Sequence, residues 1–195
     1  MLQEKFNGYS IILASQSPRR QELFKTLELP FTIRTKPTDE KYPNHLKREE
    51  ITSYLADLKA NEFEGDLDAN DVLITADTIV WFEDRAMEKP ADKQEAVSML
   101  HRLSGNIHEV ATSVCITIGP KRKIFSEITE VHFNNLSEDE ILYYVENYQP
   151  FDKAGAYGIQ EWIGYIGVSK LKGCYYNVMG LPVKNLYEEL KNFEL

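Results

Sequence analysis

The chain has 195 residues, 43% of them hydrophobic, which is enough to bury the core of an ordinary globular protein. Asp and Glu outnumber Lys and Arg by 31 to 22, and the net charge of −9 argues against nucleic acid or an anionic membrane as the main partner. No apolar run approaches the length of a membrane span, and the N-terminal segment has no run of signal-peptide length. We therefore expect a cytoplasmic protein.

The first predicted elements are a strand and a helix joined by a very short loop. An apolar run predicts a buried strand over residues 10–14, and a helix over residues 18–28 begins almost at once. Ser17 has the side chain of a helix cap, and Pro18 suits the first helical position. The chain therefore presents a helix N-terminus directly after a strand end.

This helix N-terminus is a candidate anion site. Its free N–H groups and positive dipole end attract negative charge, and two hydroxyls and two guanidinium groups lie beside it, those of Ser15, Ser17, Arg19 and Arg20. Because the two arginines point about 100° apart on a helix, one is expected to hold phosphate while the other braces the loop. The alternative is a capped helix whose arginines pair with surface carboxylates.

A second strand and a long helix follow. The strand is predicted near residues 31–35, and the loop after it carries Glu40 among polar residues and prolines. The helix is predicted from about residue 47 to 63, with an apolar face, and it carries Lys59. An acidic loop over residues 62–71 then leads to the next strand.

Asp77 stands out in the middle of an apolar stretch. Residues 72–76 fit a buried strand, residues 78–82 continue the β pattern, and a polar turn follows at 83–85. Strand ends in α/β sheets commonly present functional groups to a crevice, and we interpret Asp77 as such a group at the end of the 72–76 strand. The alternative is an aspartate that merely starts a turn.

Capping boxes and a hairpin mark the second half of the chain. Asp92 and Glu95 predict the start of a helix that ends at Gly105, and residues 110–118 and 123–133 predict two antiparallel strands joined by the turn 119–122. Ser137 and Glu140 start a helix that extends through Tyr148. Residues 162–171 are expected to form a strand, and residues 182–192 a final helix.

These elements indicate an α/β fold around a mixed sheet, with residues 1–195 as a single domain in two lobes with a cleft between them. Two polar segments are candidates for that cleft. Lys89 precedes a proline and would otherwise be a solvated loop lysine, while the segment 150–160 places Lys153 and Gln160 among glycines that allow close approach to a ligand. The alternative for the second segment is a glycine-containing surface turn.

Several kinds of site lack support. Cys115 and Cys174 are far apart, and the four histidines show no metal-ligand spacing. The chain has no Walker loop, no Gly-x-Gly-x-x-Gly turn and no Gly-x-Ser-x-Gly elbow. Carboxylates, lysines, arginines and a divalent cation are the groups left to carry difficult catalysis.

Six segments, in order along the chain, resemble the Maf-type nucleoside triphosphate pyrophosphatases. The matching residues are 13–20 with Glu22 and Leu23, 76–78, 88–90, 103–105 with His108 and Thr112, 152–160, and Asn177 with 180–182. The resemblance implies a two-lobed α/β fold of the Maf/Ham1 type around an elongated mixed sheet. It also implies a cytoplasmic enzyme, often a homodimer, that uses a divalent metal (Mg²⁺ or Mn²⁺) to cleave a nucleoside triphosphate into the monophosphate and pyrophosphate.

The resemblance also assigns residues. It implies Asp77, Glu40, Lys59 and Lys89 as catalytic residues, Ser15, Arg19, Arg20, Lys153 and Gln160 as substrate-binding residues, and Asp77 with Glu40 as metal ligands. The late motif resembles the subgroup acting on dTTP and UTP. Two residues depart from the family pattern: Glu161 stands where glycine is usual, and Cys174 stands where serine is common. Both are expected beside the base-binding end.

The residues suit this chemistry. Lysines and arginines would bind the triphosphate and absorb charge on the leaving pyrophosphate, two carboxylates suffice for magnesium, and Asp77 would orient or deprotonate water. We expect Gln160 to read a uracil or thymine edge with backbone groups of Gly158 and Ile159. Two alternatives stay open: a nucleotide-binding regulator, such as one of cell division, that does not turn over its ligand, and a purely structural domain.

Overall fold

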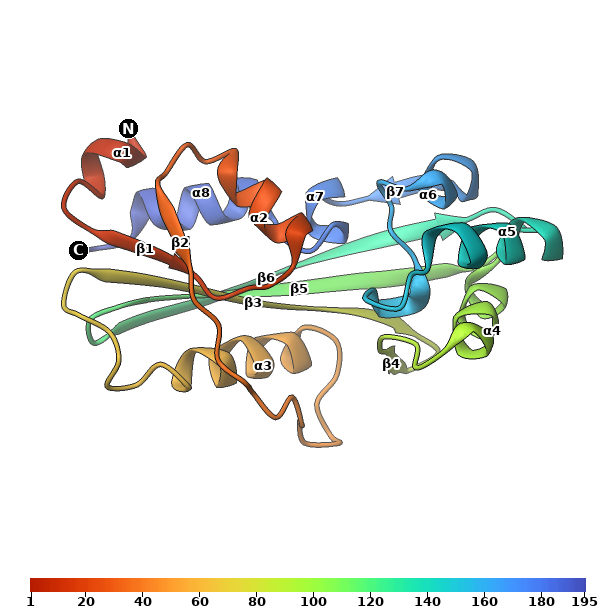
Figure 1. The fold of residues 1–195 in the computed structure, drawn as a ribbon, viewed down its shortest axis with the longest axis horizontal. Coiled ribbons are helices and arrows are strands. Elements are labelled where there is room, and N and C mark those ends of the chain that lie inside the picture. The colour runs from red at the N-terminus through yellow and green to blue at the C-terminus, as the bar shows by residue number, and fades with distance from the viewer.

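A seven-stranded mixed sheet runs along the molecule in the computed structural model, which describes residues 1–195 (Figure 1). The strand order is β2-β1-β3-β5-β6-β7, and β4 pairs with β3. Strand β1 lies parallel to both neighbours, whereas all other pairs are antiparallel. The strands are β1 (Ser10–Leu13), β2 (Phe31–Ile33), β3 (Asp71–Phe82), β4 (Arg85–Met87), β5 (Ile107–Ile118), β6 (Lys121–Phe133) and β7 (Val168–Lys172).

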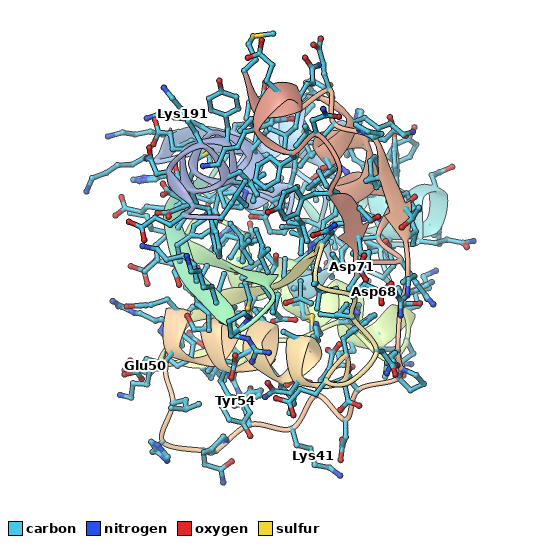
Figure 2. All side chains as sticks on the ribbon, turned by 90° about the vertical axis from the view of Figure 1, so that its left-hand side faces the viewer. Lys41, Glu50, Tyr54, Asp68, Asp71 and Lys191 are labelled. Carbon is cyan, nitrogen blue, oxygen red and sulfur yellow. The ribbon has the colours of Figure 1, made fainter.

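Helices cover both faces of this sheet. They are α1 (Leu2–Lys5), α2 (Pro18–Lys25), α3 (Glu49–Asn61), α4 (Lys93–Leu103), α5 (Glu138–Tyr148), α6 (Trp162–Gly167), α7 (Tyr175–Val178) and α8 (Val183–Asn192), with a 3₁₀ turn at Ala154–Ala156. At the end that holds both termini, α1, α2 and α8 lie on one face and α3 on the other (Figure 1). Figure 2 looks along the molecule and shows Lys191 of α8 and Tyr54 of α3 on opposite sides. None of the helices combines the length and the apolar character needed to cross a membrane.

Two large apolar cores lie at different places along the long strands. The first packs α2 and α8 on the sheet and includes Ile74 and Val114; the second packs α4 and α5 and includes Val80 and Val110. Strands β3 and β5 contribute to both cores because each is 12 residues long. The predicted mixed sheet with flanking helices is confirmed, and polar residues concentrate on the strands between the two cores.

The predicted helix caps are present, with one difference. Ser17 accepts a hydrogen bond from the Arg20 N–H, and Ser137 and Glu140 form the complete capping box. The side chain of Asp92 accepts from the Glu95 N–H, but the Glu95 carboxylate binds the Ala91 N–H instead of closing the box. Local side-chain chemistry therefore set these helix starts.

The prediction of one strand over residues 162–171 is wrong. Residues Trp162–Gly167 form α6, and only Val168–Lys172 form a strand. The two buried positions of α6, Ile163 and Gly167, are four residues apart, which is helical spacing. Gly164 allows this helix to pack closely, since an added Cβ would lie 1.8 Å from the Ile159 carbonyl oxygen. The apolar run therefore follows helical packing here and not β alternation.

Smaller elements also differ from expectation. The sequence patterns did not indicate α1, β4 or α7, each of which has only three or four residues. The hairpin turn contains just Gly119 and Pro120, because the β5–β6 ladder extends to the pair Ile118–Lys121.

Candidate active site

Asp77 lies in the middle of β3, not at the end of a strand as expected. Strand β1 pairs with β3 as far as Ile74, and β4 pairs with it from Val80 onward. Between these two points the same edge of β3 has no strand partner, although β5 continues on its other side. The apolar segments on both sides of Asp77 therefore belong to one strand, and Asp77 lies at an opening in the sheet.

The guanidinium group of Arg20 occupies this opening and bonds to the edge of β3 that has no strand partner. Its Nη1 donates to the carbonyl of Ala76 and its Nη2 to the hydroxyl of Thr78, each at 2.8 Å. Its Nε donates to the carbonyl of Gly180, also at 2.8 Å. The guanidinium group thus ties the start of α2 to β3 and to the loop before α8. Of the two adjacent arginines, Arg20 is the one that braces the structure.

Arg19 is directed across the cleft. Its Nη1 forms an ion pair with Asp152 Oδ2 at 2.8 Å, and the other oxygen of Asp152 lies 2.7 Å from Lys153 Nζ. The Asp152 side chain is 57% exposed, so an incoming anion can compete with it for Arg19. Beside them, the hydroxyl of buried Ser15 accepts from the Ser17 N–H at 3.2 Å. Of the two arginines, Arg19 is therefore the one held only by an exposed partner.

We expect Arg20→Lys to lower the free energy of unfolding by about 1–3 kcal/mol, because a lysine cannot make the three separate bonds of the planar guanidinium group. Arg19→Lys is the matched control and should change it by no more than about 0.5 kcal/mol, since its partner is exposed. Urea unfolding of both variants measures the difference. Equal losses would contradict the division of roles between the two arginines.

Lys59 joins the two carboxylates that the sequence singled out. Its Nζ lies 2.6 Å from Asp77 Oδ1 and 2.9 Å from Glu40 Oε1. Burial raises the pKa of Asp77 above its usual value, and the attraction of Lys59 and Arg20 does not fully offset this. Burial also opposes ionisation of Glu40, but Lys59 and Lys89 outweigh it and the pKa of Glu40 is lowered. The two carboxylates are therefore in unequal environments.

The same pair fits a divalent cation. The oxygens of Asp77 and Glu40 converge on one positive group, the Lys59 ammonium, and the second oxygen of each makes no hydrogen bond to the protein. No group of three or more His, Cys, Asp or Glu side chains is placed to hold a metal ion. Magnesium commonly uses one or two carboxylates and completes its shell with water and phosphate oxygens. The donor set matches that type of site.

A recess lined by both apolar and polar side chains lies on the other side of Arg20. Val80, Val110 and Tyr157 line its wall together with Lys153 and Gln160. The Oε1 atom of Gln160 is buried and has no hydrogen-bond partner in the protein, so its capacity to accept a hydrogen bond is unmet in this structure. Backbone groups of Gly158 and Ile159 were expected to help read the base, and the Gly158 N–H donates to the Tyr144 hydroxyl at 3.0 Å. That expectation stays a prediction.

All nine predicted site residues line one cleft formed by three adjoining cavities. Arg20 and Lys89 border all three cavities, and Lys89 has no ion-pair partner. The other seven are divided among the cavities: Ser15, Arg19, Glu40, Lys59, Asp77, Lys153 and Gln160. Of the two departures from the family pattern, Glu161 contacts Lys153, whereas Cys174 does not line the cleft and bonds Thr129 of β6 through its backbone.

Three further cleft residues were missed by sequence reasoning. Asp152 pairs with Arg19 and Lys153, while Glu88 and Tyr42 border the cavity of Asp77 and lie 3.4 Å apart, Oε1 to hydroxyl. Asp152 and Glu88 are direct sequence neighbours of Lys153 and Lys89, and this adjacency was the available signal. Tyr42 had none, because only the tertiary fold places its loop over the cleft.

Comparison with known proteins identifies the family of this chain. The family described as Maf-like protein matches residues 10–193. A dTTP/UTP pyrophosphatase of Flavobacterium johnsoniae is 53% identical over 190 residues, covering 97% of this chain and 98% of that protein. One of Bacteroides fragilis is 50% identical over 184 residues, covering 94% and 95%.

Solved structures support the fold. The Staphylococcus aureus Ham1 protein superimposes with a TM-score of 0.53 at 16% identity, covering 93% of this chain and 98% of that one. A HAM1 protein from Coxiella burnetii gives a TM-score of 0.50 at 16% identity, covering 95% and 100%. At this identity the likeness concerns the fold alone. The family model matches nearly the whole chain, and relatives that are 50–53% identical align over nearly its full length. This protein is therefore a member of the Maf family.

Proposed function

We propose that this protein hydrolyses dTTP and UTP to the nucleoside monophosphate and pyrophosphate. The observation that carries the proposal is the cleft itself, in which cations lie between a carboxylate pair and a recess with an unpartnered Gln160 amide oxygen. The names of relatives at 50–53% identity over nearly the full chain support the same substrates.

In this proposal the cations bind the phosphates. Lys89 is exposed and unpaired at the junction of the three cavities, and Arg19 is held only by an exposed carboxylate. Both can move to phosphate oxygens without leaving a buried charge behind. Positive groups placed near the β- and γ-phosphates stabilise the charge that develops on the leaving pyrophosphate.

Asp77 is the group proposed to move the proton. Its Oδ1 is held by Lys59, so the Oδ2 atom is left to orient water and accept its proton during attack on the α-phosphorus. Burial raises the pKa of this carboxyl, which makes it a better base than an exposed aspartate. A divalent cation bound by Asp77 and Glu40 would supply charge neutralisation between the carboxylates and the phosphates.

Gln160 is proposed to read the base. Uracil and thymine share an acceptor, donor, acceptor edge, whereas cytosine reverses part of this pattern and leaves buried groups unpaired. We expect Gln160→Ala to lower the ratio of kcat/KM for UTP over CTP by about tenfold, and kcat for UTP by less. Steady-state kinetics with UTP, dTTP, CTP and GTP measures this. A variant with unchanged selectivity would move base recognition to other groups.

The test of the proposed function is product analysis. The wild-type protein is incubated with each nucleoside triphosphate and Mg²⁺, and pyrophosphate and orthophosphate are quantified separately. We expect pyrophosphate from UTP and dTTP as the primary product. Release of orthophosphate with the diphosphate, or a preference for GTP or its methylated form, would refute the proposal.

Cellular location and assembly are part of the proposal. We place the enzyme in the cytoplasm, where its nucleotide substrates are formed, and as a possible homodimer. Light scattering on the purified protein measures its molar mass against the 22.5 kDa of one chain.

A further inference from the structure

Glu161 lies next to the recess lined by Val80, Val110, Tyr157, Lys153 and Gln160, which we call the base-side recess. Both oxygens of its carboxylate interact with other side chains. Its Oε1 is 3.1 Å from Lys153 Nζ, and its Oε2 accepts a hydrogen bond from the Tyr144 hydroxyl. Only 20% of the side chain is exposed. The backbone of Glu161 is extended with a negative φ of −97°, so nothing in its conformation requires glycine. A carboxylate at this position therefore fits without strain and makes two specific contacts.

Tyr144 links this carboxylate to the backbone of the recess. The tyrosine is fully buried, and its oxygen accepts from the Gly158 N–H at 3.0 Å. Burial raises the pKa of Tyr144, and the hydrogen bond to Glu161 raises it further, so the hydroxyl keeps its proton and donates it to the carboxylate. The chain of donors thus runs from Gly158 through Tyr144 to Glu161.

Lys153 depends on Glu161 for its place. The lysine is 7% exposed, and a buried ammonium is costly without a nearby negative charge. Its other partner, Asp152, is 57% exposed and is shared with Arg19, the arginine proposed to bind phosphate. Glu161 is the less exposed of the two partners of Lys153, and it makes no ion pair with Arg19.

The side chains of Glu161 and Gln160 both lie at Gly158. A Cβ added to Gly158 would lie 2.9 Å from the Glu161 carboxyl carbon and 3.1 Å from Gln160 Nε2, so both side chains pack against this glycine. Lys153, Gln160 and Gly158 all line the base-side recess. Glu161 therefore contacts Lys153 and lies against Gly158 without lining the recess itself.

We propose that Glu161 is a positioning residue for base selectivity, which fixes Lys153 directly and the Gly158–Gln160 backbone through Tyr144. This inference rests on the proposed function, because it concerns the same recess and its preference for uracil and thymine. Glu161 does not touch the reacting phosphates. Its loss should therefore weaken discrimination between bases and leave the chemical step nearly unchanged.

Glu161→Gln is the direct test. The amide oxygen of glutamine can still accept a hydrogen bond from Tyr144, but the NH2 group that then faces Lys153 cannot pair with its ammonium group. We expect the preference for UMP over CMP in equilibrium binding, and for UTP over CTP in kcat/KM, to fall by about tenfold, with kcat for UTP changed less than about threefold. Glu146→Gln is the matched control, because Glu146 also pairs with a lysine, Lys93 at 2.6 Å, on the outside of α5.

A second background separates positioning from general loosening. In Lys153→Met, the added change Glu161→Gln should lower the UMP preference by less than about twofold, since the partner through which it acts is gone. Tyr144→Phe, which removes the anchor of the carboxylate, should give a smaller loss of the same preference and replaces Glu161→Gln if that variant does not fold. Circular dichroism and thermal melts check each fold.

The outcomes are distinct. Full base preference in folded Glu161→Gln, or an equal tenfold loss in the Lys153→Met background, overturns the inference. A wild-type protein that releases pyrophosphate from UTP but has no preference for UMP over CMP overturns it as well. Absence of pyrophosphate release by the wild type refutes the proposed function itself, and does so independently of any variant.

Discussion

Replacing Asp77 by asparagine should lower turnover by at least about 100-fold, the lower range for loss of a general acid–base group. Asparagine keeps the size of the side chain and can still accept the bond from Lys59, but it cannot take a proton from water or carry the negative charge. Steady-state rates of pyrophosphate release from UTP measure the loss. The matched control is Asp57→Asn. Asp57 lies on α3 outside the cleft, and its carboxylate pairs with Arg122 at 2.8 Å.

The same variant should fold at least as well as the wild type. Burial raises the pKa of Asp77 above 3.8, so the folded protein binds this proton more tightly than the unfolded chain does. Ionised Asp77 therefore lowers stability at pH values above its folded-state pKa, and this cost disappears as the pH falls below the usual aspartate range. We expect Asp77→Asn to melt at an equal or higher temperature at pH 7. Near-normal turnover in a folded variant would move the catalytic role elsewhere, with Glu40 next.

Removing divalent cations should abolish activity, by at least about 100-fold, because two carboxylates and a triphosphate then face one another without shielding. The Lys59 ammonium lies 2.6 Å from Asp77 Oδ1 and 2.9 Å from Glu40 Oε1. This single positive charge cannot neutralise two carboxylates and the triphosphate together. The measurement is the initial rate of pyrophosphate release after treatment with a chelator, followed by titration with Mg²⁺ or Mn²⁺.

Glu40→Gln sharpens this test. It leaves Asp77 in place and removes one proposed ligand, so the Mg²⁺ concentration for half-maximal rate should rise by about tenfold or more. Asp57→Asn should leave that concentration unchanged. Full activity of the wild type in excess chelator would contradict the metal requirement.

The sequence by itself determined the features that depend on a few neighbouring residues. Ser17 and Ser137 cap their helices as predicted, because a capping side chain bonds to a backbone group only three residues away. The long strands were recognisable from their apolar and β-branched residues. The resemblance of six segments to the Maf family indicated the reaction class, and the residue types in the cleft suit it.

Tertiary structure decided how those groups are used. Arg19 and Arg20 are adjacent and chemically identical, yet Arg20 bonds to residues 56 and 160 positions away, and Arg19 is the one that we propose binds phosphate. Residues 162–167 are as apolar as a strand, but their close packing on Ile159 makes them a helix. The pairing of Lys153 with Glu161, and of Glu161 with Tyr144, joins three elements. Such contacts depend on which charged and polar groups are buried together, and burial is a property of the folded chain and not of any local pattern.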